Sequence, residues 1–111
     1  MIEISSIEHL QKILQSDGRI LILDFYANWC GPCKMLTPLL EEYENVYTNF
    51  VSVLKINVDE NSELLELFGV TAMPTIIFYQ QGKYFDDLKL VGADIGAIKA
   101  NVNLILTQYN V

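Results

Sequence analysis

The chain has 111 residues, of which 51% are apolar, and this length and composition suit a single packed domain over residues 1–111. Its formal net charge is -7 at pH 7, and the sequence holds no cluster of Lys or Arg that could follow a phosphate backbone. We therefore expect neither nucleic acid nor an anionic membrane surface as a partner.

The first residues and the hydropathy pattern bear on where the protein works. The segment MIEISSIEHLQK lacks the basic region and apolar run of a secretory signal peptide. No later segment approaches the ~20 consecutive apolar residues of a membrane-spanning helix. We therefore expect a cytoplasmic protein, and we expect it to be a monomer.

The chain opens with a short predicted strand over residues 2–4, followed by an amphipathic helix. Ser5 and Glu8 have the spacing of a capping box, and apolar residues recur at helical intervals until Ser-Asp-Gly at 16–18 ends the pattern. The next segment, RILILDFY over 19–26, is an almost unbroken apolar run. Such a run is typical of a central strand that is covered on both faces of its sheet.

A long second helix is predicted to follow the strand. From Cys33 onward an apolar stripe recurs at helical spacing, and Pro38 removes a backbone donor, so we expect the helix to be kinked. The stripe consists of Leu36, Leu39, Leu40, Tyr43 and Tyr47.

The second half of the chain alternates in the same way. A strand is predicted over 50–58, a short helix over 62–69 closed by Gly69, and two strands over 75–85 around a Gln-Gly turn. A last helix is predicted over 93–108, with Asp94 at its N-terminus. Its apolar stripe consists of Ile95, Ile98, Val102, Ile105 and Leu106. The order β-α-β-α-β-α-β-β-α predicts an α/β fold with a mixed central sheet flanked by helices on both faces.

The two cysteines, Cys30 and Cys33, are separated by only two residues. A disulfide across so small a loop constrains the unfolded chain little, so a structural role explains the pair poorly. Redox chemistry or metal binding is favoured in a cytosolic chain. Pro32 suits the first turn of a helix, which predicts that the pair marks the start of the second helix.

This placement makes the two thiols unequal. The positive end of the helix and its free backbone donors would stabilise a thiolate at Cys30, so Cys30 is predicted to attack a disulfide from an exposed helix start. Cys33 lies on the same face, but deeper, and is the candidate resolving thiol. Two alternatives remain: both cysteines are simply small buried side chains, or they form half of a zinc site. Zinc generally needs four ligands, and beyond the two cysteines the sequence offers only His9, which lies in the predicted first helix and is expected at the surface.

Asp24 lies inside the apolar run that precedes the cysteines. Burial makes a carboxylate costly and should raise its pKa, which makes Asp24 a candidate acceptor for the proton of Cys33. Lys55, in the neighbouring strand pattern, could offset that burial. The alternatives are a solvated aspartate at the strand end and a lysine exposed at the sheet edge.

Four features in order resemble the thioredoxin family across essentially the whole chain. They are WCGPCK, Asp24 six positions before the first cysteine, MPT about forty residues after the second cysteine, and VGA near the C-terminus. The resemblance implies a thioredoxin-like fold and a protein-disulfide reductase that needs no cofactor beyond the Cys30–Cys33 dithiol. It also implies that Gly31, Pro32 and Lys55 tune the redox pair.

The resemblance further implies how targets bind. Pro74 would follow a cis peptide bond and present the backbone of Met73 to an extended substrate segment. The apolar rim of the substrate groove would consist of Trp29, Ala72, Gly92 and Ala93. One departure is Tyr26, which stands where many bacterial members carry tryptophan and which leaves the chemistry intact.

The implied partners are an NADPH-dependent flavoprotein, thioredoxin reductase, as the electron donor, and disulfide-containing targets such as peroxiredoxin or ribonucleotide reductase. The implied process is electron transport in cell redox homeostasis. A non-catalytic subunit that uses the same surface only to hold a partner is the alternative from another functional class.

Overall fold

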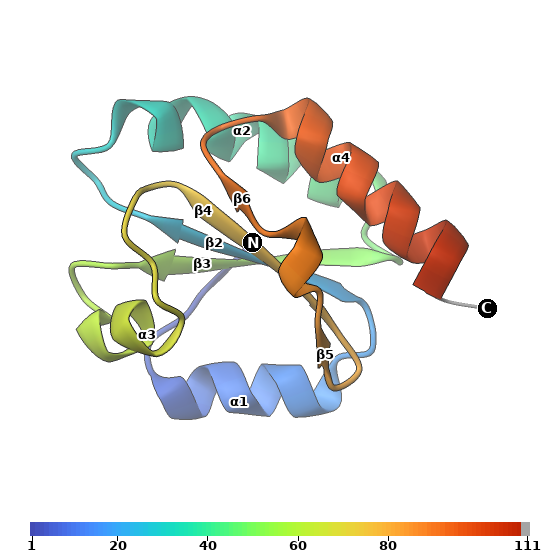
Figure 1. Cartoon of the computed structure of the whole chain (residues 1–111), viewed down its shortest axis with the longest axis horizontal. Helices are drawn as coiled ribbons and strands as arrows, with labels where there is room; N and C mark the ends of the chain where they lie inside the picture. The colour runs from blue at the N-terminus through green and yellow to red at the C-terminus, as the bar shows by residue number, and fades with distance from the viewer. Residues whose placement is uncertain (110–111) are drawn as a thin grey trace.

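A mixed β-sheet lies between two layers of helices, with α1 and α3 on one face and α2 and α4 on the other (Figure 1). This computed structural model describes residues 1–109. In chain order the elements are β1 (Ile2–Glu3), α1 (Ile7–Ser16), β2 (Ile20–Tyr26), α2 (Gly31–Val46), β3 (Val51–Asn57), α3 (Ser62–Leu67), β4 (Thr75–Gln80), β5 (Lys83–Tyr84), a 3-10 turn (Asp86–Leu88), β6 (Leu90–Val91), α4 (Ile95–Leu104) and a π-helical turn (Ile105–Tyr109). The predicted α/β class, with helices on both faces, is confirmed.

The sheet order within these residues is β1-β3-β2-β4-β5, and β6 also pairs with β4. β2 runs parallel to β3 and antiparallel to β4, which makes it the central strand. All of β3 is buried, as is all of β2 except Tyr26. The almost unbroken apolar run over 19–26 predicted β2 to within one residue, because strands covered on both faces do not alternate. The strand predicted over 50–58 contains β3, whose polar residues Ser52, Lys55 and Asn57 are buried as well.

Each face of the sheet carries its own apolar core. One core joins Leu23 and Phe25 of β2 to Leu10 of α1 and Leu64 of α3. On the opposite face, Ile22 belongs to a core formed with α2 and α4. Successive side chains of β2 thus pack into the cores on opposite faces of the sheet, as the alternation of side chains along a strand requires.

The ends of the helices show where the sequence pattern was right and where it was wrong. Asp94 caps α4 as predicted, its Oδ1 accepting from the amide of Ala97 at 3.0 Å. The capping box of Ser5 and Glu8 is wrong, because the cap of α1 is Ser6. The Ser6 hydroxyl oxygen accepts from the amide of His9 at 3.0 Å.

Two predicted stripes include residues that the fold leaves at the surface. Leu39 and Tyr47 of the α2 pattern are 44% and 47% exposed, and Leu106 near the C-terminus is 37% exposed. The other members of the α2 stripe, Leu36, Leu40 and Tyr43, are buried. Helical spacing identified the correct face of α2, but it made the buried stripe too wide.

The chain turns back twice between β4 and α4. Gln81 and Gly82 form the predicted two-residue turn, and both have positive φ, as hairpins with mirror-image turns require. The 3-10 turn and β6 were not predicted, so the observed strand order contains one strand more than the predicted one. β6 is two residues long, too short to show a period of its own.

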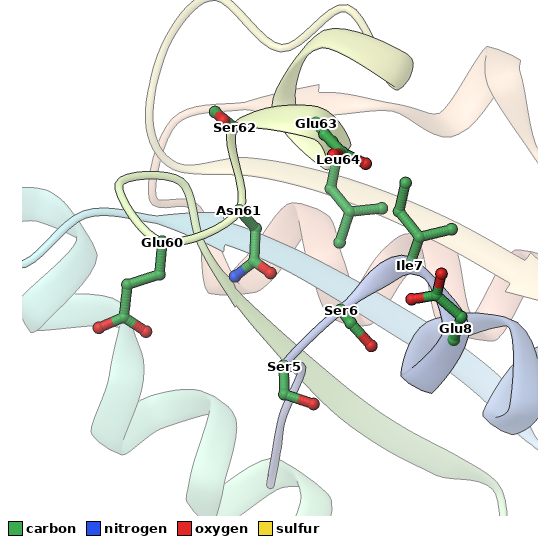
Figure 2. A pocket seen from close by; sticks show the side chains of 9 residues that line it. All are labelled: Ser5, Ser6, Ile7, Glu8, Glu60, Asn61, Ser62, Glu63 and Leu64. Carbon is green, nitrogen blue, oxygen red and sulfur yellow. The ribbon is translucent and has the colours of Figure 1, made fainter.

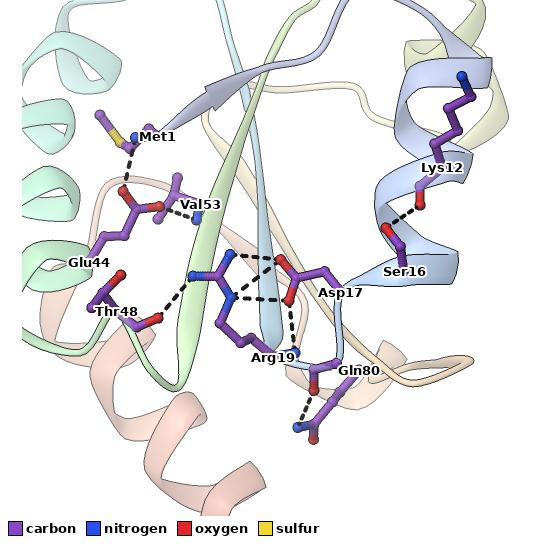
Figure 3. A network of polar contacts seen from close by, with 10 residues as sticks. Met1, Lys12, Ser16, Asp17, Arg19, Glu44, Thr48, Val53 and Gln80 are labelled. Carbon is purple, nitrogen blue, oxygen red and sulfur yellow. Dashed lines mark hydrogen bonds and ion pairs between the residues drawn. The ribbon is translucent and has the colours of Figure 1, made fainter.

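Polar contacts join the central strands β2 and β3 to α2 and to the loop that follows it (Figure 3). The guanidinium of Arg19 donates to both carboxylate oxygens of Asp17 and to the carbonyl of Thr48, which links the start of β2 to the loop after α2. Glu44 of α2 accepts from the Met1 amino group and from the amide of Val53. These contacts hold α2 against the sheet at the end away from the cysteines.

Candidate active site

Cys30 and Cys33 lie where β2 passes into α2, as the sequence predicts. Cys30 is the N-cap of α2, and its sulfur accepts from the amide of Cys33 at 3.2 Å. Pro32 occupies the first turn of the helix. The two cysteines form a disulfide, with their Cα atoms 5.3 Å apart. The Cys30 sulfur therefore sits where free backbone donors and the helix dipole favour negative charge.

Exposure does not separate the two sulfurs as the sequence analysis expected. Cys30 is 6% exposed and Cys33 is 3% exposed, so both are buried in the disulfide form. The prediction of an exposed Cys30 is wrong because the cap is covered by the loop that carries Met73. The carbonyl oxygen of Met73 lies 3.7 Å from the Cys30 sulfur. What distinguishes Cys30 is its position as the cap.

The loop before β4 approaches the redox pair. The Met73–Pro74 peptide bond is cis, as the family resemblance implied. Pro74 is buried and Met73 is half-buried, and the Pro74 carbonyl accepts from the amide of Gly92 at 2.9 Å. The structure therefore brings Met73, Pro74 and Gly92 together beside Cys30.

The remaining predicted rim residues are at the surface. Trp29 is 67% exposed, and its indole nitrogen donates to Asp59 at 3.0 Å. Ala72 and Ala93 are exposed on the loops that adjoin Met73 and Gly92. Gly31 is exposed in the first turn of α2, and a Cβ added there would meet no atom within 4 Å.

Asp24 and Lys55 form an ion pair inside the protein. The parallel register of β2 and β3 places the two residues opposite each other, and Lys55 Nζ lies 3.0 Å from Asp24 Oδ2. Asp24 is 1% exposed and Lys55 is 5% exposed, so the alternatives of a solvated aspartate and an edge lysine are both wrong. The second oxygen, Asp24 Oδ1, is buried without a hydrogen-bond partner.

Burial raises the pKa of Asp24 above its ordinary value, and it outweighs the opposing attraction of Lys55. The carboxylate of Glu3 adds to the increase. A buried carboxyl whose pKa is raised holds a proton more readily than an exposed carboxyl, which suits a proton acceptor. The unpaired Oδ1 leaves room on the carboxyl for that proton.

Sequence reasoning missed one polar residue of this site. Thr37 of α2 accepts from Lys55 Nζ at 2.9 Å, and its hydroxyl donates to the Cys33 carbonyl at 3.0 Å. Tyr26, noted only as a departure from the family, places its ring 4.2 Å below Lys55 Nζ and donates its hydroxyl to Glu3 at 2.6 Å. The spacing of four residues between Cys33 and Thr37 on a helix was the available signal.

Other sites lie apart from the redox pair. Figure 2 shows a hollow between the start of α1 and the segment that leads into α3, and neither cysteine lines it.

Within residues 1–109 no three His, Cys, Asp or Glu side chains converge in a way that could hold a metal ion. His9, the one histidine of the sequence, accepts at Nδ1 from the Ser5 amide. None of the described helices is long and apolar enough to cross a bilayer.

Comparison with known proteins agrees with this geometry. The Thioredoxin family model matches residues 1–103. The chain belongs to the thioredoxin family. It is 37% identical to thioredoxin-2 of Saccharomyces cerevisiae over 97 residues, which cover 87% of this chain and 90% of that protein. It is 40% identical to Thioredoxin-T of Drosophila melanogaster over 76 residues, 68% of this chain but only 48% of that longer protein.

Solved structures show the same fold. The thioredoxin of Fasciola hepatica superposes with a TM-score of 0.85 at 33% identity, covering 93% of this chain and 97% of that chain. Family membership together with the Cys30–Cys33 disulfide identifies the protein as a thiol-disulfide oxidoreductase of the protein-disulfide reductase type. Thioredoxins in general work with a thioredoxin reductase and with disulfide-containing targets.

Proposed function

We propose that Cys30 is the nucleophile, Cys33 the resolving thiol and Asp24 the proton acceptor in the reduction of disulfides in target proteins. The observation that carries the proposal is the position of the Cys30 sulfur as the cap of α2, where it accepts from the Cys33 amide. The same contact that the disulfide form makes would stabilise a Cys30 thiolate in the reduced form.

The proposed reaction has two exchange steps. The Cys30 thiolate attacks one sulfur of the target disulfide, and the other target sulfur leaves as a thiolate. Cys33 then passes its proton to Asp24, and its sulfur attacks Cys30 to release the second target thiolate. The target gains two electrons, and Cys30 and Cys33 are joined by the disulfide seen in the structure.

The surroundings of the pair receive supporting roles. The backbone of Met73 and the cis Pro74 would hold an extended target segment beside Cys30, within a rim of Trp29, Ala72, Gly92 and Ala93. Gly31, Pro32 and Lys55 would tune the pair through the helix start and the ion pair with Asp24.

The wider setting follows from this chemistry. The dithiol would be the only redox group that the protein needs, and an NADPH-dependent flavoprotein reductase would return electrons to it. Targets would include a peroxiredoxin or ribonucleotide reductase, reduced by a monomer in electron transport that maintains cell redox homeostasis. A reducing compartment such as the cytoplasm suits a dithiol that must be returned to its reduced state.

Trapping of targets tests the assigned roles. In Cys33→Ser the first exchange proceeds but nothing resolves its product, so Cys30 should accumulate in mixed disulfides with target proteins. In Cys30→Ser the attacking sulfur is lost, and no such adducts should form. Each variant is exposed to a cell extract, and the adducts are identified by mass spectrometry.

Cys30→Ser/Cys33→Ser is the matched control, and wild type is assayed beside all three variants for reduction of insulin disulfides with an added NADPH-dependent reductase. Adducts in Cys30→Ser that match those in Cys33→Ser would reverse the assignment. Biological activity retained by the double variant would instead support the non-catalytic subunit.

A further inference from the structure

Thr37 joins the resolving cysteine to the buried ion pair. Its hydroxyl donates to the Cys33 carbonyl at 3.0 Å, and its oxygen accepts from Lys55 Nζ at 2.9 Å. Lys55 Nζ also donates to Asp24 Oδ2 at 3.0 Å. One side chain of α2 thus connects the backbone of the thiol that must lose a proton with the cation that lies on the proposed acceptor.

The geometry fixes the direction of this link. The Thr37 hydroxyl has one hydrogen, and donation of that hydrogen to Cys33 turns its lone pairs toward Lys55. Because Lys55 is buried, its charge is costly unless acceptors surround it, so each hydrogen bond to its ammonium group stabilises it. Below the ammonium group the ring of Tyr26 supplies a further favourable contact. Lys55 is therefore held in one place by Asp24, Thr37 and Tyr26.

We propose that Thr37 is a positioning residue for the resolving step, because it holds Lys55 where the cation favours the ionised Asp24 carboxylate that is to accept the proton of Cys33. The inference rests on the proposed role of Asp24. The inference adds Thr37, which lies outside the redox motif, to the residues that support the resolving step. It also explains why α2 carries a hydroxyl at this position.

The electrostatic surroundings determine the expected effect. β4 places the uncharged Ile76 opposite Asp24. Burial raises the pKa of Asp24, and Lys55 is the group that opposes the increase. If Lys55 loses one acceptor and is held less closely, the pKa of Asp24 rises further and less of the acceptor is ionised at a given pH. The titratable groups in or beside this network are Glu3 of β1, Asp24 and Tyr26 of β2, Cys33 of α2, Lys55 of β3 and Glu60 after β3.

The resolving step can be measured alone. Cys30 of the full chain is loaded as a mixed disulfide with the chromogenic thiol thionitrobenzoate, and its release by Cys33 is followed by absorbance as a function of pH. In this step Cys33 gives its proton to Asp24, the Cys30–Cys33 bond forms, and thionitrobenzoate leaves as a thiolate. The acid limb of the rate profile then reports the ionisation of Asp24.

Thr37→Val keeps the shape of the side chain but removes both hydrogen bonds. We expect its acid limb to move to higher pH by about half a unit to one unit, the size of one lost hydrogen bond expressed as a pKa change. Thr37→Ser keeps the hydroxyl and should restore the wild-type profile. A carbon-13 NMR titration of the Asp24 carboxyl should show the same displacement. A limb that stays in place, or moves to lower pH, overturns the inference.

Thr107→Val is the matched control. Thr107 also donates its hydroxyl to the carbonyl four residues earlier, that of Asn103, at 2.9 Å, and it lies near the C-terminus of the described chain. Loss of a helix-bound threonine hydroxyl as such would therefore affect both variants. We expect the Thr107→Val profile to match that of wild type, and a displacement equal to that of Thr37→Val would overturn the inference.

Asp24→Asn separates the inference from the function on which it rests. If Asp24→Asn loses the acid limb and Thr37→Val behaves as wild type, only the role of Thr37 is overturned. If Asp24→Asn keeps the wild-type limb, Asp24 is not the proton acceptor and both proposals fail. In Asp24→Asn/Thr37→Val the effect of the threonine should disappear, since the two residues act on the same proton.

Discussion

Asp17 and Asp24 lie on either side of the start of β2, and each faces one basic side chain, yet their pKa values move in opposite directions. Asp17 accepts with both oxygens from Arg19 at the protein surface, and these hydrogen bonds lower its pKa. Asp24 accepts with one oxygen from Lys55 in the interior, and burial raises its pKa. An ion pair therefore does not by itself fix a carboxylate in its charged form. Solvation and the number of hydrogen bonds decide the direction.

The largest expected effect comes from removing the cation of the interior pair. Lys55→Met leaves Asp24 buried without a partner, which should lower the free energy of unfolding by about 3–5 kcal/mol at pH 7. The deficit relative to wild type should shrink at low pH, where Asp24 is protonated. Denaturant unfolding at both pH values measures it.

Arg19→Met is the control for the Lys55 variant, because it removes the cation of the surface pair. It should cost at most about 1 kcal/mol, since exposed ion pairs contribute little. Lys55→Met/Asp24→Asn should recover most of the lost stability. Equal costs for Lys55→Met and Arg19→Met would contradict the distinction between the two pairs.

A smaller effect, of opposite sign, is expected from Asp24→Asn. Below its ordinary pKa of 3.8 the carboxyl is protonated in the folded and unfolded chains alike, whereas above its raised folded-state pKa the charge destabilises the fold. The variant should therefore be more stable than wild type at pH 7 by something on the order of 1 kcal/mol. Lys55 still has two acceptors in this variant, the hydroxyl of Thr37 and the oxygen of the introduced amide.

Unfolding measured between pH 3 and pH 8 tests this sign. The gain from Asp24→Asn should vanish as the pH falls below about 3.8. A variant that is less stable than wild type at pH 7 would show that Lys55 stabilises the carboxylate by more than burial opposes it.

The smallest effect is expected from Asp17→Asn, and it is destabilising. The folded-state pKa of Asp17 is lowered, so its contribution is present above the ordinary value of 3.8 and is lost as the pH falls through the lowered value. We expect a loss of at most about 1 kcal/mol at pH 7, reduced by added salt. A gain in stability would mean that Asp17 and Asp24 behave alike after all.

Sequence patterns predicted the parts of the fold that depend on continuous burial or on a fixed motif. β2, β3 and the helix start at Pro32 belong to this group, as does the partnership of Asp24 and Lys55. The short strand β6 was not predicted, since two residues are too few to show a hydrophobic period. The choice between Ser5 and Ser6 as the cap of α1 depends on backbone angles that adjacent serines do not reveal.

The site was predictable in its chemistry and less so in its surroundings. The motif identified both cysteines, but the burial of Cys30 depends on the loop at Met73, which is distant in sequence. Thr37 was missed because its link to the site is the hydrogen bond from Lys55, and Lys55 lies on β3, far from α2 in sequence. The four-residue spacing to Cys33 indicates only the bond to the Cys33 carbonyl and not the contact with Lys55.

The lengths of the strands have a consequence for the mode of target binding proposed above. β2, β3 and β4 have six or seven residues each, whereas β1, β5 and β6 have two. Glu3 and Lys83 place a charge on the outer strands β1 and β5. Short, charged borders offer almost no template for strand addition. A target segment that binds beside Cys30 as proposed would therefore find little at β1 or β5 with which to extend the sheet.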